Sequence, residues 1–219
     1  MINARFYPAI KQEAQGILEK IGWNPSVEFK GSYLFSKSCG CTEVEIEKRV
    51  LAAHQLLDLN IAQSNRRMIF HYGRLKSKNQ RDDYLHGVPG LLNKVLPHAL
   101  KGAGKNLISI NCDERDDITV TELHKYISPC AIKKGYVVLE NVVRAKSNFD
   151  TIGIMYADLV SYLAGRIDTI SNDSELFEGI TEEQLNQNGK IRKLKSSKEL
   201  ISKIKLNLYR PKNKSVRTA

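Results

Sequence analysis

The stretch that decides the fold reads IMYADLVSYLAGR and occupies residues 154–166. Its apolar side chains recur every three or four residues, and the stripe is wide enough to predict a largely buried helix. Asp158 stands near the middle of this helix. Because a buried carboxylate is costly unless it is paired, hydrogen-bonded or bound to a metal, the partner of Asp158 indicates the chemistry. Two interpretations stay open: a capping or ion-paired residue at the rim of the core, or a member of a functional site.

Helical and strand patterns alternate on the N-terminal side of this stretch, and one further helix is predicted on its C-terminal side. Helices are predicted at 7–21, 43–62, 91–99, 120–133 and 197–209, the fourth of them from a capping box between Thr119 and Glu122. Strands are predicted at 27–30, 67–72, 107–112 and 136–143. This alternation predicts an α/β fold with a mixed, mainly parallel sheet flanked by helices. We expect one α/β domain over residues 1–170 and a basic, helical or flexible C-terminal extension over residues 171–219.

The positive charge of the chain is concentrated near its C-terminus. The formal net charge is +10, and residues 190–217 carry eleven Lys or Arg against one acid, Glu199. That sign favours an anionic partner, most simply nucleic acid. In this interpretation Arg192, Lys193 and Lys195 bind phosphates. The alternative is a solvated tail that only improves solubility.

Several classes of protein are excluded by missing patterns. No apolar run reaches the roughly 18 residues of a membrane span, so we expect no membrane partner. The N-terminus lacks the apolar core of a signal peptide, which predicts a cytoplasmic protein. The sequence contains no Gly-x-Ser-x-Gly elbow or plausible Cys–His pair, and its four cysteines lack zinc-site spacing. Serine and cysteine hydrolases and zinc proteins are therefore disfavoured.

Three carboxylates stand where a cation site could form. Asp113 follows the predicted strand 107–112, and ligands gather at the carboxyl ends of strands in α/β sheets. Glu28 lies inside a predicted strand, with Lys30 on the same face by the two-residue period. Together with Asp158 they could converge on Mg²⁺ or Mn²⁺, which prefer oxygen ligands. Plainer interpretations remain: Glu28 on an exposed face, and Asp113 in a polar loop before a helix.

Basic side chains border this expected site. Arg115 follows Asp113 closely, and Arg144 and Lys146 lie between the strand 136–143 and the helix that carries Asp158. These side chains could hold phosphate oxygens of a nucleic acid. For Arg144 and Lys146, a polar loop without such a function is equally consistent with the sequence.

Three short motifs occur in a recognisable order: Glu-x-Lys-Gly-Ser at 28–32, Asp-Glu-Arg at 113–115 and Ala-Asp-Leu-Val-x-x-x-x-Gly at 157–165. In this order they resemble the DUF3800 family over roughly residues 7–168. The family pattern has Gln where this chain has Met155. It also opens with an N-terminal hairpin bearing Asp-Glu-Ser-Gly, whereas this sequence contains no Asp or Glu before Glu13.

The resemblance implies an RNase H-like fold and a metal-dependent nuclease of bacteria, phages or mobile elements, with a role in phage defence among the expectations. It assigns Glu28, Asp113 and Asp158 as catalytic, metal-binding acids, with Lys30 as a charge-supporting neighbour. The missing hairpin motivates the alternative, a catalytically inactive nucleic-acid-binding or assembly protein on the same fold. It also makes a homo-oligomer, or a second chain that completes the sheet, an expected partner.

Overall fold

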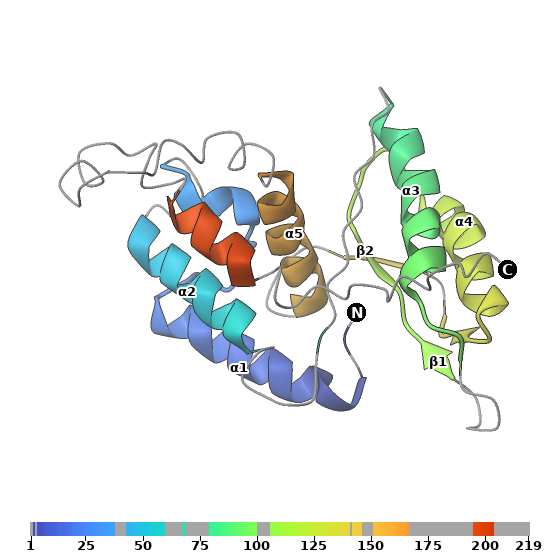
Figure 1. Cartoon of the computed structure of the whole chain (residues 1–219), viewed down its shortest axis with the longest axis horizontal. Helices are drawn as coiled ribbons and strands as arrows, with labels where there is room; N and C mark the ends of the chain where they lie inside the picture. The colour runs from blue at the N-terminus through green and yellow to red at the C-terminus, as the bar shows by residue number, and fades with distance from the viewer. Residues whose placement is uncertain are drawn as a thin grey trace, which may run out of the picture. The chain divides into compact units, whose positions relative to one another are not determined.

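The computed structural model describes residues 2, 4–37, 43–59, 68, 79–99, 106–140, 142–145, 151–166 and 195–203. These residues form two compact units, both drawn in Figure 1. Unit 1 takes its described residues from the ranges 1–72 and 145–207, and unit 2 takes its described residues from the range 73–144. The residues expected to form one domain, 1–170, therefore contribute to both units.

Unit 1 is mostly helical in its described part. Its elements are η1 (Ala4–Phe6), α1 (Tyr7–Lys20), η2 (Gly31–Phe35), α2 (Ile46–Asp58), α5 (Ile152–Gly165) and a helix over residues 195–203. The helices predicted at 7–21 and 43–62 and the helix carrying Asp158 are confirmed, with ends that differ by a few residues. Of the strand predicted at 67–72, only Met68 is described, and it forms an isolated antiparallel bridge with Ile2.

Helix α1 ends in a local motif that the sequence encodes. Gly22 adopts a φ of 75°, the left-handed conformation that favours glycine. The Trp23 amide then donates to the Leu18 carbonyl at 3.0 Å, and the Gly22 amide donates to the Glu19 carbonyl at 2.9 Å. These two bonds are the Schellman pattern, which satisfies carbonyls at the end of a helix. The chain thereby reverses toward Phe29.

The strand predicted at 27–30 is wrong: Val27 lies in a bend, and residues 28–30 pair with no strand in the described part of the chain. Phe29 is buried and meets Trp23 edge to face, with ring centroids 4.9 Å apart. The Trp23 indole also donates to the Val27 carbonyl at 2.9 Å. Packing of one side of this segment thus explains the alternation of residues 27–30, and a β-ladder is not needed.

The core of unit 1 contains the apolar face of α5. Seven α5 side chains are buried: Ile152, Ile154, Met155, Tyr156, Leu159, Val160 and Leu163. The hydroxyl of Tyr156 donates to the Leu56 carbonyl of α2 at 2.8 Å. Burial raises the pKa of this Tyr156 hydroxyl, so that it stays a neutral donor. The apolar helix predicted from residues 154–166 is therefore confirmed as a core element.

Unit 2 combines helices and short strands. Its elements are α3 (Gln80–Val95), β1 (Leu107–Ile108), β2 (Asn111–Asp113), α4 (Val120–Lys133), β3 (Val137–Val138) and β4 (Val143–Ala145), the last of which ends at the unit boundary. Strands β1 and β3 pair in parallel, with Leu107 opposite Val137, and β2 pairs with β4. Because α4 connects β1 to β3, the described part of the chain contains a βαβ unit.

Helices α3 and α4 pack side by side in Figure 1, and their apolar faces enclose the core of unit 2. The capping box that begins α4 is confirmed: Thr119 accepts from the Glu122 amide at 3.2 Å, and Glu122 accepts from the Thr119 amide at 3.0 Å. The helix predicted at 91–99 differs. The observed helix, α3, begins at Gln80 and continues through Pro89. It ends at Val95, shortly before Pro97.

The long strand predicted at 136–143 is interrupted at Glu140, whose φ is 57°. A left-handed conformation is strained for a residue with a side chain, and it bends the chain between β3 and β4. Hydrogen bonds continue on both sides of the bend. The Leu139 amide donates to the Ile108 carbonyl at 2.8 Å, and the Val143 amide donates to the Ile110 carbonyl at 2.9 Å. The predicted α/β class and parallel pairing are thus seen in unit 2.

None of the described helices is long and apolar enough to cross a membrane.

Candidate functional site

Asp158 has a definite partner. Its Oδ2 accepts a hydrogen bond of 2.6 Å from the backbone amide of Gly31, the first residue of η2. The carboxylate is half-buried. A bond from an amide to an ionised carboxylate is short and stronger than a neutral one. Asp158 therefore caps η2 from α5 and joins two of the short sequence motifs, which are 127 residues apart.

Gly31 is needed at this contact because the backbone of η2 lies against α5. A Cβ added at Gly31 would be 2.5 Å from Cβ and 2.9 Å from Cγ of Tyr162. Real carbon atoms that are not bonded approach to about 3.5–4.0 Å. The glycine of the Glu-x-Lys-Gly motif is therefore explained by close packing, which the sequence pattern could not reveal.

Glu28 and Lys30 form an ion pair just before η2. The Lys30 ammonium is 2.5 Å from Oε2 of Glu28, and the two side chains are 38% and 24% exposed, Lys30 being the more exposed. The prediction that both side chains lie on one face is consistent with this pair. Glu28 is thus three residues from the amide that binds Asp158, so two of the three predicted acids belong to one neighbourhood of unit 1.

Arg49 of α2 is a buried cation that the sequence patterns did not reveal. It is 2% exposed. Its Nε donates to the Val44 carbonyl at 2.8 Å, and Nη1 donates to the carbonyls of Tyr33 and Ser36. These bonds hold the end of η2 against the start of α2. The only available sequence signal was an arginine inside an amphipathic helix, and such residues usually face solvent.

The basic helix over residues 195–203 packs within unit 1. Ser197, Leu200 and Ile201 are buried, and the Lys203 ammonium is 2.5 Å from Oδ2 of Asp58 on α2. Near this pair, burial and then the charge of Lys203 lower the pKa of His54. Residues 195–203 of the predicted extension therefore form a helix that packs in unit 1. Lys195, a predicted phosphate ligand, is exposed on this helix.

Asp113 lies in unit 2, at the end of β2, and is exposed. Its Oδ1 accepts from the amide of Glu114 at 3.0 Å. Nearby, Arg115 forms a two-pronged pair with Asp117, at 2.9 Å from Nε and 2.8 Å from Nη2. This hydrogen bonding with Arg115 lowers the pKa of the exposed Asp117 carboxyl. The guanidinium of Arg115 also lies over the Tyr84 ring, 5.2 Å from its centroid.

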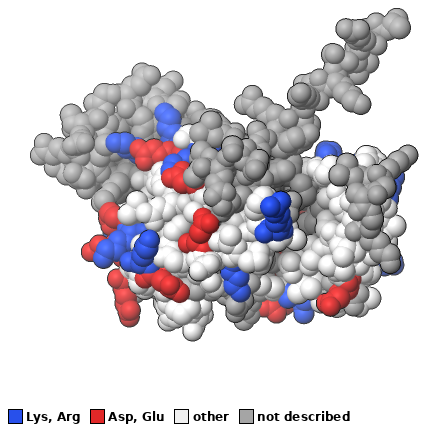
Figure 2. Space-filling view, turned by 90° about the horizontal axis from the view of Figure 1, so that it is seen from below, with Lys and Arg blue, Asp and Glu red and all other residues white. Residues whose placement is uncertain are grey.

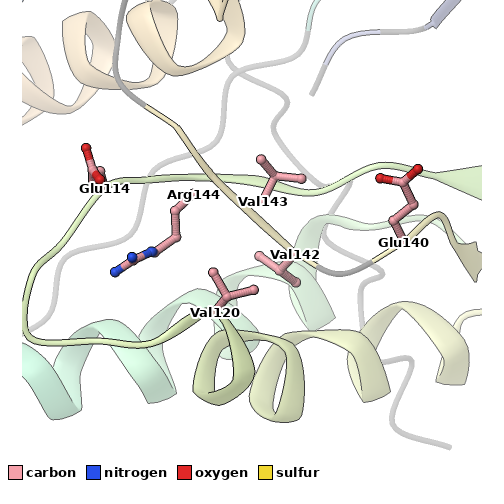
Figure 3. A pocket seen from close by; sticks show the side chains of 6 residues that line it. All are labelled: Glu114, Val120, Glu140, Val142, Val143 and Arg144. Carbon is pink, nitrogen blue, oxygen red and sulfur yellow. The ribbon is translucent and has the colours of Figure 1, made fainter.

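A cavity of about 400 Å³ lies beside this loop in unit 2. It is lined by Glu114, Val120, Glu140, Val142, Val143 and Arg144 (Figure 3). Arg144 Nη1 donates to the carbonyls of Arg115 and Ile118, both at 2.8 Å. In Figure 3 the Arg144 and Glu114 side chains lie toward one end of the cavity and Glu140 toward the other. Arg144 thus orders the loop before α4, and two carboxylates accompany it in the lining.

Cys112 of β2 is buried and carries no disulfide. Burial raises the pKa of its thiol to about 11, the hydrogen bond with Tyr84 acting in the opposite direction. A thiol with so high a pKa is almost entirely protonated at neutral pH and is a poor nucleophile. This environment is that of an ordinary reduced core cysteine.

The predicted residues therefore divide between the units. Glu28, Lys30, Asp158 and Lys195 belong to unit 1, and Asp113, Arg115 and Arg144 belong to unit 2. Lys146, Arg192 and Lys193 lie outside the described residues. Within the described ranges, no group of three or more His, Cys, Asp or Glu side chains could hold a metal ion. On the face shown in Figure 2, basic and acidic side chains are interspersed.

Comparison with protein-family models, with curated proteins and with solved structures finds no match to this chain. The likeness to the DUF3800 family therefore rests on the three short motifs and their order.

Proposed function

We propose that this chain is a DUF3800-like, RNase H-related protein that acts on nucleic acid, with Glu28 and Asp158 as its divalent-cation ligands. The observation that carries the proposal is the hydrogen bond from Gly31 to Asp158. It joins the Glu-x-Lys-Gly and Ala-Asp-Leu-Val motifs, whose order first suggested the family. The proposed setting is a phage or a mobile element.

Unit 1 offers two carboxylates, those of Glu28 and Asp158, as ligands for Mg²⁺ or Mn²⁺. Mg²⁺ is commonly held by one or two carboxylates together with water and substrate phosphates. Asp158 uses Oδ2 for Gly31, while Glu28 uses Oε2 for Lys30. Each carboxylate has a second oxygen that could serve as a ligand. Asp113 lies in unit 2 and is not part of this cation site.

The proposal assigns each residue of the site a role in phosphodiester hydrolysis. The bound cation would stabilise the charge that develops on phosphate oxygens during phosphodiester hydrolysis. The Gly31 amide orients Asp158, and Lys30 balances the charge of Glu28. The basic residues near the C-terminus, Lys195 among them, contribute affinity for phosphates along the strand.

The test is divalent-cation binding by the full chain and by Asp158→Asn, measured by titration calorimetry with Mn²⁺. Asparagine retains an oxygen acceptor for the Gly31 amide, so the variant removes charge while preserving the cap. Glu19→Gln, an exposed acid on α1, is the matched control. We expect Mn²⁺ binding in the wild type and in Glu19→Gln and its loss in Asp158→Asn. Equal Mn²⁺ binding by all three would refute the carboxylate assignment.

A second candidate is a catalytically inactive nucleic-acid-binding or assembly protein on the same fold. It is favoured by a specific observation: both proposed ligand carboxylates already have partners in the protein, an amide for Asp158 and an ammonium for Glu28. Nucleic-acid binding that needs no divalent cation and survives Asp158→Asn would support this candidate. Light scattering on the purified chain tests the accompanying expectation of an oligomer.

A further inference from the structure

Arg166, the residue that follows α5, carries a half-buried charge without an acidic partner among the described residues. Its guanidinium carbon is 5.1 Å from the ring centroid of Tyr162 and 5.7 Å from that of Phe35. Nη1 donates to Oγ of Ser197 at 3.3 Å. Two aromatic rings and a hydroxyl therefore hold this cation in place, but no carboxylate in the described part of the chain neutralises it.

This arrangement leaves N–H donors on the edge of the guanidinium available for further hydrogen bonds. Contact with an aromatic ring engages the planar face, whereas hydrogen bonds leave from the edge. The group has five N–H donors, of which the bond to Ser197 and a hydrogen bond with Tyr162 occupy two. A guanidinium with donors to spare binds a phosphate through two parallel hydrogen bonds. Burial raises the pKa of Tyr162, the Arg166 charge opposing the shift, so the ring beside Arg166 remains neutral.

The position of Arg166 relates it to the carboxylate site. Asp158, Tyr162 and Arg166 are spaced four residues apart, so they follow one face of α5. Tyr162 packs on Gly31, whose amide binds Asp158. Eight residues of helix span roughly 12 Å. A phosphate at Arg166 would therefore be a different one from any phosphate held near Asp158 on the same strand.

The hydrogen-bond partner of Arg166, Ser197, belongs to a basic helix. Ser197 lies on the basic helix over residues 195–203, between Lys195 and Lys198 in the sequence, and both lysines are exposed. The one acid on this helix is Glu199, whose Oε2 is 3.9 Å from Nε2 of His54. The Arg166–Ser197 bond thus ties α5 to the one segment of the basic C-terminal region that the structure describes.

We propose that Arg166 is a phosphate-binding residue for the nucleic-acid strand, held by Tyr162, Phe35 and Ser197 at the end of α5. This assignment rests on the proposed function, because it requires that unit 1 bind nucleic acid. It adds a contact that the sequence motifs did not include.

The experiment measures binding of a fluorescently labelled single-stranded oligonucleotide by anisotropy over a series of salt concentrations. The full chain is compared with Arg166→Gln, with Arg166→Lys and with Arg5→Gln. Arg5 is the matched control because it is an exposed arginine of unit 1 that also lies over a phenyl ring, 5.8 Å from the centroid of Phe6. Circular dichroism verifies that each variant is folded.

We expect Arg166→Gln to weaken binding about tenfold, as the loss of a charge-assisted contact does. Its salt dependence, the slope of log K against log salt, should decrease by about 0.7 for one phosphate contact with a single strand. Arg166→Lys should retain the salt slope but lose part of the affinity, since lysine cannot form the two-pronged contact. Arg5→Gln should behave as the wild type.

If Arg166→Gln proves unfolded, Arg166→Lys decides the question by its loss of affinity. Binding by the wild type together with equal affinity and salt slope in the folded Arg166 variants would overturn the assignment while leaving the proposed function intact. Failure of the wild type to bind nucleic acid at all would instead overturn the proposed function, and the assignment with it.

Discussion

Substitution of Gly31 by alanine tests the packing that places Asp158. Gly31 is buried at the start of η2, and among the described residues only Gly22 and Gly135 are glycines with positive φ. Alanine can therefore adopt the backbone conformation of Gly31, and the effect of the new methyl group is steric. The methyl group would be 2.5 Å from Cβ of Tyr162. Because that atom is fixed to the backbone of α5, rotation of the tyrosine ring cannot relieve the overlap.

The magnitude follows from two costs. Overpacking a well-packed contact typically costs about 1–3 kcal/mol. Separating η2 from α5 would also weaken the bond between the Gly31 amide and Asp158, and hydrogen bonds to charged groups contribute about 1.5–3 kcal/mol. We expect Gly31→Ala to lower the free energy of unfolding by about 3 kcal/mol. For a chain of this size that corresponds to a decrease in Tm of roughly 6–12 °C.

Gly16 supplies the matched control. It lies inside α1, and a Cβ added there would meet nothing within 4 Å. In a helix interior, alanine is favoured over glycine by about 1 kcal/mol. The same substitution should therefore stabilise the chain at Gly16 and destabilise it at Gly31. Urea unfolding followed by circular dichroism measures both. A Gly31→Ala variant as stable as the wild type would refute the close packing of η2 on α5.

Three further predictions concern single side chains. Arg49→Met should lower the free energy of unfolding by about 3 kcal/mol or more in urea titrations, because three backbone carbonyls lose their donor; a loss below about 1 kcal/mol would contradict the role assigned to Arg49. Burial lowers the pKa of His54 below 6.5, so the unfolded chain binds the proton more readily. Stability should therefore fall as pH decreases through 6.5, and His54→Gln should abolish this dependence when unfolding is compared between about pH 5 and pH 8. With a thiol pKa of about 11, Cys112 should react with a thiol reagent at neutral pH far more slowly than it does in urea, and equal rates would show that it is accessible.

Local patterns predicted the elements whose determinants are themselves local. Helix α4 begins where the Thr119–Glu122 capping box indicates, and α1 ends where Gly22 allows a left-handed turn. The apolar stripe of α5 required burial, and the structure buries it. In each case the decisive hydrogen bonds or side chains lie within one or two helical turns of each other.

Predictions failed where tertiary contacts outweighed local preference. The segment before η2 alternates like a strand, but it joins no β-ladder in the described part of the chain, and its alternation reflects the packing of Phe29 on Trp23. Helix α3 continues through Pro89, since its apolar side chains contribute to the core of unit 2. A single strand was expected at 136–143, yet Glu140 bends it. Sequence periodicity contains no information about these distant neighbours.

The candidate site shows the same division. From the sequence alone came the buried helix, its carboxylate and the order of the acidic motifs. The partner of Asp158 is an amide 127 residues away, and only the folded chain reveals it. The same holds for the contact of Gly31 with Tyr162, for the three carbonyls bound by Arg49 and for the two rings beside Arg166. The physical reason is that hydrogen bonds and packing depend on separations of a few ångströms in space, and chain order does not determine those separations.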